Sequence, residues 1–228
     1  VMNSAYAVYK VIENDGATAS TIEPTSTSNS IFETSDGYRW KYMYSLTSAE
    51  TLNFMSSDFI HVSTDSTVSA AAVDGALDTI LVVAGGSSFN TSSGSTISAI
   101  PIRGDGSGGV ASVTIGSGAI TAAAVTTAGT GYTFAYIRTA DIVAATNAGG
   151  SGSGDNLNVI IPPKGGHGNN AVEELGGFYV MLNKSLVGLE GTSDITVSND
   201  FRRIGLLRNP TNFGTTTIAS ADTRRQLY

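Results

Sequence analysis

The chain has 228 residues, no cysteine and a formal net charge of −7, with 41% hydrophobic and only 14% charged residues. So low a charged fraction argues against disorder, and 12 basic residues in an acidic chain argue against a nucleic-acid partner. The lack of cysteine excludes a disulfide framework and thiolate sites, and no apolar run of about 18 residues predicts a membrane span.

The first predicted elements are two strands separated by a turn-rich connector. Residues 5–13, AYAVYKVIE, alternate well enough to predict a strand. The connector over 14–30 contains an Asn-Asp-Gly turn signal and Pro24, which disfavours regular structure. The β pattern returns over residues 30–46, interrupted by Asp-Gly at 36–37.

Four aromatic residues recur at alternate positions within DGYRWKYMYSL, residues 36–46. Because side chains of a strand alternate between its two faces, these rings are predicted to line one face, with residues 39, 41 and 43 on the other. A buried core face is the default interpretation, and an assembly interface is the alternative. The four aromatic residues are Tyr38, Trp40, Tyr42 and Tyr44.

A helix and a further strand are predicted next. Residues 47–57, TSAETLNFMSS, place Thr47 and Glu50 at capping-box spacing. Residues 58–63, DFIHVS, are predicted to form a strand, in which His61 is interpreted as an ordinary strand residue rather than a ligand.

The middle of the chain, residues 76–158, holds 15 of the 27 glycines and a weak internal repeat. ALDTILVVAGGSSFN from residue 76 matches AITAAAVTTAGTGYT at a spacing of 43, with Gly86 on Gly129 and Phe89 on Tyr132. Each copy predicts a strand, a glycine turn, an aromatic residue, a second strand and a glycine-rich tip. Two copies are too few for a solenoid, so a small sandwich or hairpin-rich inserted domain is predicted.

The last zone combines strands with one short helix. NLNVIIPP, residues 156–163, predicts a strand, and a helix is expected between an Asn170 cap with Glu173 and a stop at Gly176. Further strands are predicted over 178–188, 194–198 and 202–210.

Two neighbouring arginines in that last strand, Arg202 and Arg203, lie on opposite faces of it. Solvated surface residues are the favoured interpretation. An assembly interface is the alternative, because arginine is enriched at interface cores.

The elements together predict a mainly β, β-sandwich-like fold with two or three short helices. Residues 1–75 and 157–228 are predicted to form one discontinuous domain, because their compositions resemble each other more than that of the middle. Residues 76–156 form a Gly/Ser/Thr-rich β insertion in this scheme, and the ends of an inserted domain usually lie close together. The chain lacks an initiator Met, so we expect a segment of a longer protein.

No residue pattern nominates a catalytic centre, a metal or a cofactor. His167 lies near Glu173 and Glu174 in KGGHGNNAVEE, but no metal-ligand spacing supports that trio, and helix capping explains Glu173. GDGSGG, residues 104–109, precedes a strand-like segment and lacks the lysine and the helix of a phosphate-binding loop. The sequence therefore predicts a protein that is not an enzyme and binds no cofactor.

Two motifs resemble the baseplate wedge subunits of contractile-tailed, T-even-like bacteriophages, the family of the eighth-gene product. These proteins carry an EPT segment followed by DGY-x-W-x-Y, and an FR-x-I-x-x-x-x-NP segment. GHGNNAVEELGGFYVMLN, between the two, is also similar to the family. The first motif is matched by Glu23, Pro24, Asp36, Gly37, Tyr38, Trp40 and Tyr42, and the second by Phe201, Arg202, Ile204, Asn209 and Pro210. The resemblance covers the outer zones only.

The resemblance implies a mostly β, two-domain, non-enzymatic virion protein of the tail baseplate. Such a protein forms a homodimer, binds other wedge proteins, and passes on the rearrangement that triggers tail contraction. No nucleic acid or membrane partner is expected. The rival hypothesis is a carbohydrate-binding or depolymerising β domain of a tail fibre, which would display exposed Tyr and Trp in a groove beside a carboxylate pair.

Overall fold

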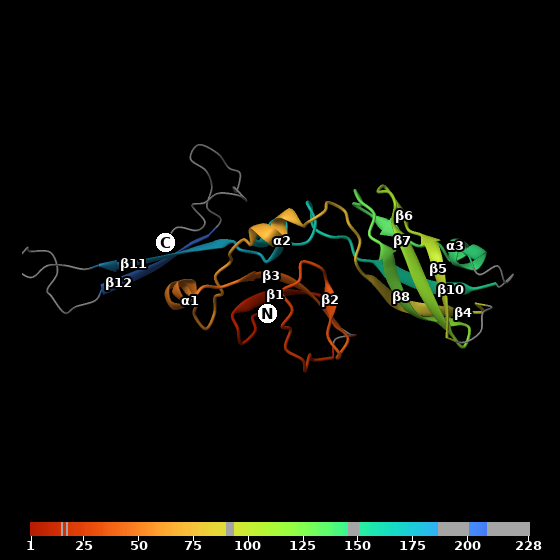
Figure 1. The fold of residues 1–228 in the computed structure, drawn as a ribbon, viewed down its shortest axis with the longest axis horizontal. Coiled ribbons are helices and arrows are strands. Elements are labelled where there is room, and N and C mark those ends of the chain that lie inside the picture. The colour runs from red at the N-terminus through yellow and green to blue at the C-terminus, as the bar shows by residue number, and fades with distance from the viewer. Residues whose placement is uncertain (15, 17, 90–93, 146–150, 187–200, 209–228) are drawn as a thin grey trace, which may run out of the picture. The chain divides into compact units, whose positions relative to one another are not determined.

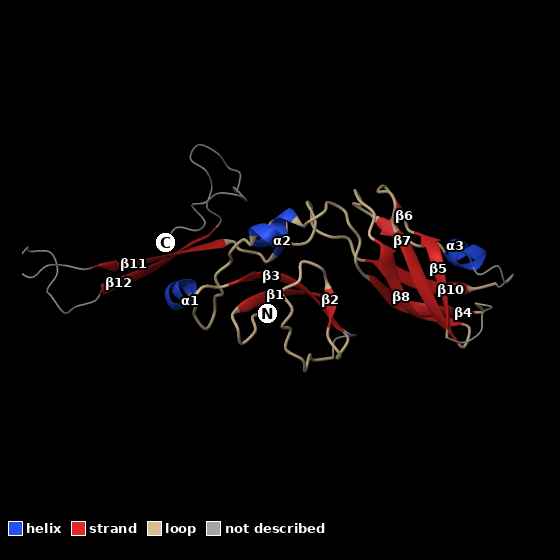
Figure 2. Ribbon diagram, in the orientation of Figure 1, coloured by secondary structure: helices blue, strands red, loops and turns tan. Residues whose placement is uncertain are grey.

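The structure of the protein is a computed structural model, and it describes residues 1–14, 16, 18–89, 94–145, 151–186 and 201–208, the backbone alone in 182–186 and 201–208. This part of the chain contains twelve strands and four short helices (Figure 1, Figure 2). The predicted mainly β fold with short helices is confirmed, with four helices where two or three were expected.

The strands are β1 (Ala7–Asn14), β2 (Phe32–Glu33), β3 (Tyr38–Ser45), β4 (Ile80–Ser87), β5 (Ser95–Pro101), β6 (Arg103–Gly104), β7 (Val110–Gly116), β8 (Ala119–Thr127), β9 (Ala135–Tyr136), β10 (Ser153–Val159), β11 (Tyr179–Leu186) and β12 (Phe201–Arg208). The helices are α1 (Ser48–Phe54), α2 (Ser66–Ala70), α3 (Thr139–Ala145) and α4 (Ala171–Glu174). None of the four helices in the described part of the chain has the length and hydropathy needed to cross a membrane.

Contacts divide the chain into two compact units. Unit 1 comprises Val1–Lys10, Met43–Ser66 and Asn170–Tyr228, and unit 2 comprises Val11–Tyr42 and Thr67–Asn169. The predicted domain boundaries at 75/76 and 156/157 stay a prediction.

The hairpin of β2 and β3 confirms the β pattern predicted for the N-terminal zone, and its turn holds the preceding connector in place. The Asp36 carboxylate accepts hydrogen bonds from the Ser20 hydroxyl and from the backbone N–H groups of residues 21 and 22, at 2.7–3.1 Å. The Thr34 hydroxyl, which donates to Asp36 at 2.5 Å, and these further donors hold the pKa of Asp36 well below its usual range. The Asp-Gly turn therefore lies against residues 20–22, directly before Glu23 and Pro24.

The aromatic residues of β3 are mostly inside the protein. Trp40, Tyr42 and Tyr44 are buried, and half-buried Tyr38 stacks on Trp40 with 5.5 Å between ring centroids. The alternate positions 41 and 43 are buried as well, so both faces of this strand are covered. These rings therefore contribute to packing within the chain.

The main core lies in unit 2, where the sheets β5-β7-β8 and β10-β4 enclose one cluster of buried residues, with α3 beside them (Figure 1). In β7 the residues alternate strictly, with Ala111, Val113 and Ile115 facing this core. The alternation has a period of two because successive side chains of a strand point to opposite faces.

Strands of the two segments matched by the predicted internal repeat pair with each other across the segments. β7 and β10 occupy equivalent positions at the repeat spacing of 43. β4, the first strand of the first copy, pairs with β10 of the second copy, and β8, the first strand of the second copy, pairs with β7 of the first. Where the first copy has β5, the second has the helix α3, so the second strand predicted for that copy is wrong apart from the two residues of β9.

The matched aromatics of the repeat are both buried against glycines of the other copy. A Cβ on Gly152 would lie 2.4 Å from Cδ1 of Phe89, and a Cβ on Gly109 would lie 2.8 Å from the hydroxyl oxygen of Tyr132. Such separations are far below normal van der Waals contact, so a side chain at either position would force the neighbouring ring to shift. Each ring therefore packs on a glycine of the other copy's glycine-rich tip, Phe89 on Gly152 and Tyr132 on Gly109.

Three local predictions in unit 1 were tested by the structure. The capping box of Thr47 and Glu50 is present at the start of α1, and Asn170 caps α4, so both predicted helices are confirmed. The predicted strand over 58–63 is wrong. Its backbone turns back on itself, with the N–H of Ser56 donating to the carbonyl of Phe59 at 3.1 Å.

Two of the three strands predicted for the C-terminal zone are confirmed. β11 and β12 form an antiparallel pair at the positions expected for two of them. The strand predicted over 194–198 lies outside the described residues.

Candidate functional site

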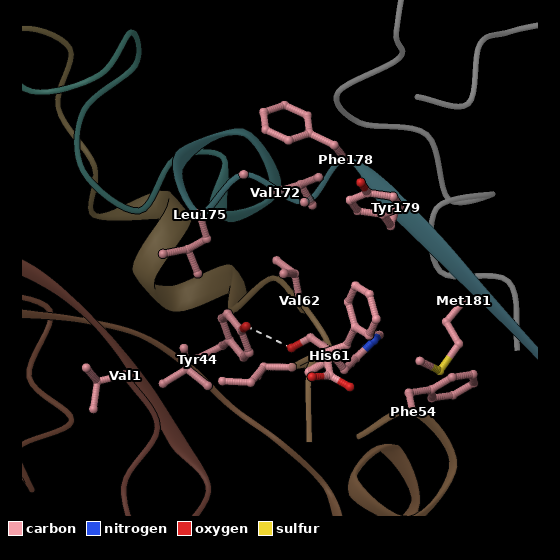
Figure 3. Close-up of a pocket in the computed structure, with 16 residues that line it drawn as sticks. Val1, Tyr44, Phe54, His61, Val62, Val172, Leu175, Phe178, Tyr179 and Met181 are labelled. Atoms are coloured by element: carbon pink, nitrogen blue, oxygen red, sulfur yellow. Dashed lines mark hydrogen bonds between the residues drawn. The ribbon is translucent and has the colours of Figure 1, made fainter. Parts of the chain in front are cut away.

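Unit 1 contains a pocket with a volume of about 380 Å³ (Figure 3). A volume in this range is typical of sites that bury a small molecule or a protruding side chain. The pocket is lined by Val1, Val8, Tyr44, Phe54, Asp58, Phe59, Ile60, His61, Val62, Val172, Leu175, Gly176, Gly177, Phe178, Tyr179 and Met181.

One wall is the irregular segment that follows α1. The hydroxyl of Tyr44, on β3, donates to the carbonyl oxygen of His61 at 2.8 Å and fixes this segment against the sheet (Figure 3). The His61 ring stacks on Phe54, the last residue of α1, with 5.4 Å between centroids. Burial raises the pKa of the Tyr44 hydroxyl, so it remains a protonated donor at neutral pH.

The opposite wall is α4 and the start of β11 (Figure 3). After α4, Gly176 adopts a φ of +72°, and the Gly177 N–H donates to the Val172 carbonyl at 2.7 Å. This turn reverses the chain and brings Phe178 and Tyr179 to the pocket. A left-handed residue after the last helical turn favours glycine, which explains Gly176.

The pocket has an apolar floor and an exposed aromatic rim. Val8 and Tyr44 of the floor belong to a buried cluster against which Leu175 packs. At the rim, Phe178 is 53% exposed and Tyr179 is 49% exposed. Large apolar side chains exposed around a hollow are typical of surfaces that bind a partner.

The polar group in the pocket wall that can change its charge near neutral pH is His61. Its Nε2 lies 3.5 Å from a carboxylate oxygen of Glu50. Burial lowers the pKa of His61, and the negative charge of Glu50 raises it in part. Burial alone would raise the pKa of Glu50, but hydrogen bonds from Thr47 together with His61 lower it.

We expect the substitution Glu50→Gln to lower the pKa of His61 further, because it removes the negative charge that favours the imidazolium. An NMR pH titration of the imidazole measures this shift. Glu173→Gln, which removes a carboxylate that does not shift His61, is the matched control. A His61 pKa unchanged in Glu50→Gln would contradict the pairing.

The lowered pKa of His61 also determines how the stability of the fold changes with pH. Since the pKa of His61 is lowered by folding, the unfolded chain binds its proton more readily than the folded chain. This contribution to stability is present above the unfolded pKa of about 6.5 and is lost as the pH falls through the folded value.

Glu50, the carboxylate paired with His61 beside the pocket, has a structural role. The carboxylate of Glu50 already accepts from the backbone N–H and the hydroxyl of Thr47, at 2.8 and 2.7 Å, and so serves the helix cap. Among the residues that the structure describes, no group of three or more His, Cys, Asp or Glu side chains could hold a metal ion. The lining combines apolar and aromatic side chains with the imidazole of His61 and the carboxylate of Asp58, so it can accommodate an aromatic group that also carries a polar atom.

The structure brings one of the residues nominated from the sequence to this pocket. Tyr44 lines it, whereas Tyr38, Trp40 and Tyr42 do not. The backbone register places Arg202 opposite Ser185 and Arg203 opposite Lys184 in the β11–β12 pair. Neither the core nor the interface interpretation of these arginines is tested by the described residues.

His167, considered as a catalytic residue with Glu173 or Glu174, is buried in the glycine-rich loop before α4. Glu174 accepts from Lys10 Nζ at 2.9 Å, and the N–H of Glu173 donates to the Asn170 cap. The carboxylate of Glu174 therefore has a structural role in unit 1, whereas Glu173 takes part in the cap through its backbone.

Sequence reasoning missed most of the pocket residues. Phe54, Phe178 and Met181 come from segments far apart in the chain, and neither motif nor spacing links them. One sequence feature could have pointed to the pocket: Phe178 and Tyr179 directly follow Gly176 and Gly177, where the helix was predicted to end.

Comparisons of the chain with protein-family models, curated proteins and solved structures find no match.

Proposed function

We propose that the chain is a structural subunit of a phage tail baseplate wedge, which holds neighbouring wedge proteins and relays the rearrangement that triggers contraction. The observation that carries the assembly role is the pocket of unit 1 with its exposed aromatic rim of Phe178 and Tyr179. An anchor side chain of a neighbouring protein would fill such a hollow and bury the rim.

The assignment to a baseplate wedge rests on the two motifs that resemble the eighth-gene-product family. In this chain the first motif is built as a structural unit. Asp36 binds the segment at 20–22, the Tyr38 hydroxyl donates to the Thr18 carbonyl, and Trp40 Nε1 donates to the Thr34 hydroxyl at 3.0 Å. Residues that shape a scaffold in this way support a mechanical role rather than a catalytic one.

The rival hypothesis draws no support from the aromatic residues of β3. Sugar stacking needs ring faces that are open to solvent, and Trp40 is 2% exposed. Buried Tyr42 and Tyr44 are equally closed to a ligand.

The proposal is tested by mixing the purified chain with the proteins encoded beside it and measuring association by light scattering. We expect a homodimer that survives dilution and a stable complex with at least one tail protein. Phe178→Ala should weaken that complex about 30-fold, the effect of losing roughly 2 kcal/mol at an anchor position.

Leu52→Ala is the matched control. Leu52 is 77% exposed on α1 but does not line the pocket, so its removal should leave affinity unchanged. A monomer with no affinity for any tail protein would overturn the proposal, and binding to a glycan array would favour the rival.

A further inference from the structure

A second exposed surface lies in unit 2, on the short β6–β9 pair and the residues beside it. Along residues 134–138 the side chains alternate, with Ala135 and Ile137 packed against the main core. Phe134 and Tyr136 point outward, 54% and 46% exposed, and Arg138 follows them at the next outward position. β6 places Arg103 directly opposite Tyr136. We call this surface the Arg–aromatic strip: Arg103, Phe134, Tyr136 and Arg138.

Hydrogen bonds of Asp105 and Tyr132 fix the backbone at residues 132–134, where the strip begins. Asp105 accepts from the N–H groups of Thr133 and Phe134 at 2.9 and 3.1 Å, and also from the Thr133 hydroxyl. The Thr133 hydroxyl, with these N–H groups, lowers the pKa of Asp105 to about 2, so the clamp is charged at neutral pH. Buried Tyr132 anchors the same segment by donating to the Ile102 carbonyl at 3.1 Å.

The two arginines are held by a single carboxylate. Arg103 donates through its Nε and Nη2 to the carboxylate of Asp141, both at 3.0 Å. Arg138 donates through its own Nε and Nη2 to the same carboxylate, both at 3.3 Å. Asp141 lies on α3, and its side chain is only 11% exposed. Fixed side chains lose little conformational entropy on binding, so this strip is organised before a partner arrives.

The hydrogen-bonding capacity of the two arginines is not used up. Two guanidinium groups share the carboxylate of Asp141, and the other nearby carboxylate, Asp105, is used by the N–H groups of Thr133 and Phe134 rather than by either arginine. The Nη1 groups of Arg103 and Arg138 make no hydrogen bond within the described ranges, and each can donate two more. Arginine forks with open donors pair best with carboxylates.

We propose that the Arg–aromatic strip binds a segment of another protein that carries a carboxylate beside apolar side chains. The apolar side chains would cover Phe134 and Tyr136, and the carboxylate would accept from the free edges of Arg103 and Arg138. Tyrosine and arginine are the residues most enriched at the centres of protein interfaces. The strip shares no residue with the pocket of unit 1, so it is an additional contact surface and does not depend on the role proposed for that pocket.

The test uses the whole chain and short synthetic peptides in fluorescence polarisation. One set carries a single Asp or Glu flanked by Leu, Phe or Tyr, and a matched set carries Asn or Gln instead. We expect acidic peptides to bind about 10-fold tighter than their amide counterparts, with affinity falling as salt rises. The double substitution Phe134→Ala and Tyr136→Ala should weaken binding about 10-fold or more.

Two further variants keep the result interpretable. Val83→Ala changes another exposed side chain of unit 2, 62% exposed on β4, and should leave binding unchanged. Arg138→Gln retains the aromatic rings and should abolish the preference for acidic peptides. Equal binding of acidic and amide peptides, no peptide binding, or binding insensitive to the aromatic substitutions would overturn the proposal. Dextran binding that the double substitution abolishes would overturn it in favour of a sugar-binding surface.

Discussion

Tyr132→Ala is expected to lower the free energy of unfolding by about 3–5 kcal/mol, the range for removing a large buried aromatic side chain. Tyr132 is 3% exposed and belongs to the main core of unit 2. Its side chain fills the space above Gly106, Gly109 and Gly129, and a Cβ on any of them would lie within 3 Å of a ring atom or of the hydroxyl oxygen. Glycines have no side chain with which to close the cavity, so the loss cannot be relieved by repacking.

The hydroxyl of Tyr132 has a separate contribution. It donates to the Ile102 carbonyl and accepts from the Gly109 N–H, both at 3.1 Å and both buried. Tyr132→Phe keeps the ring but leaves these backbone groups without their partner, and we expect a loss of about 1–3 kcal/mol.

Urea unfolding of the two variants measures both effects. Tyr136→Ala, an exposed tyrosine four residues along the chain, is the matched control and should change stability by no more than about 0.5 kcal/mol. A loss in Tyr132→Ala as small as that of the control would show that the ring does not support the core.

Gly129→Ala is expected to lower stability by about 2–5 kcal/mol, because strain and crowding combine. Gly129 has a φ of +63°, which L side chains rarely adopt. A Cβ there would also lie 2.6 Å from the Gly109 nitrogen and 2.6 Å from the Ser107 oxygen. Both are backbone atoms, so neither can move without displacing the neighbouring glycine-rich segment.

Gly131→Ala separates the two causes. Gly131 has a φ of +74°, but a Cβ there would meet nothing within 4 Å. It should therefore lose only the conformational term, about 1–2 kcal/mol. Equal losses in the two variants, measured by the same urea unfolding, would mean that close packing at Gly129 contributes nothing.

The features that the sequence predicted correctly are local ones. The capping box of α1 needs two residues three positions apart, and the cap of α4 needs Asn170 alone. The β2–β3 hairpin follows from Asp-Gly between two alternating segments, and the strands β4 and β8 follow from the repeat. In each case the interacting groups are close in the chain, so spacing and residue type are sufficient information.

The segment over 58–63 shows where that information ends. Phe59, Ile60 and Val62 read as a strand, but a strand needs a neighbour with free backbone groups, and here the turn at 56–59 and the Tyr44 hydroxyl take those groups. The alternation of β3 likewise predicted one buried face, while packing covered both.

What the sequence determined by itself is a mainly β chain with its helix caps, its hairpin turns and two copies of one β unit. Only the tertiary structure decided that strands of the two copies pair with each other, that the pocket gathers Phe54, Phe178 and Met181, and that Asp141 holds Arg103 and Arg138 together. Pairings between residues distant in the chain depend on which surfaces are buried together, and burial is a property of the whole fold rather than of any short segment.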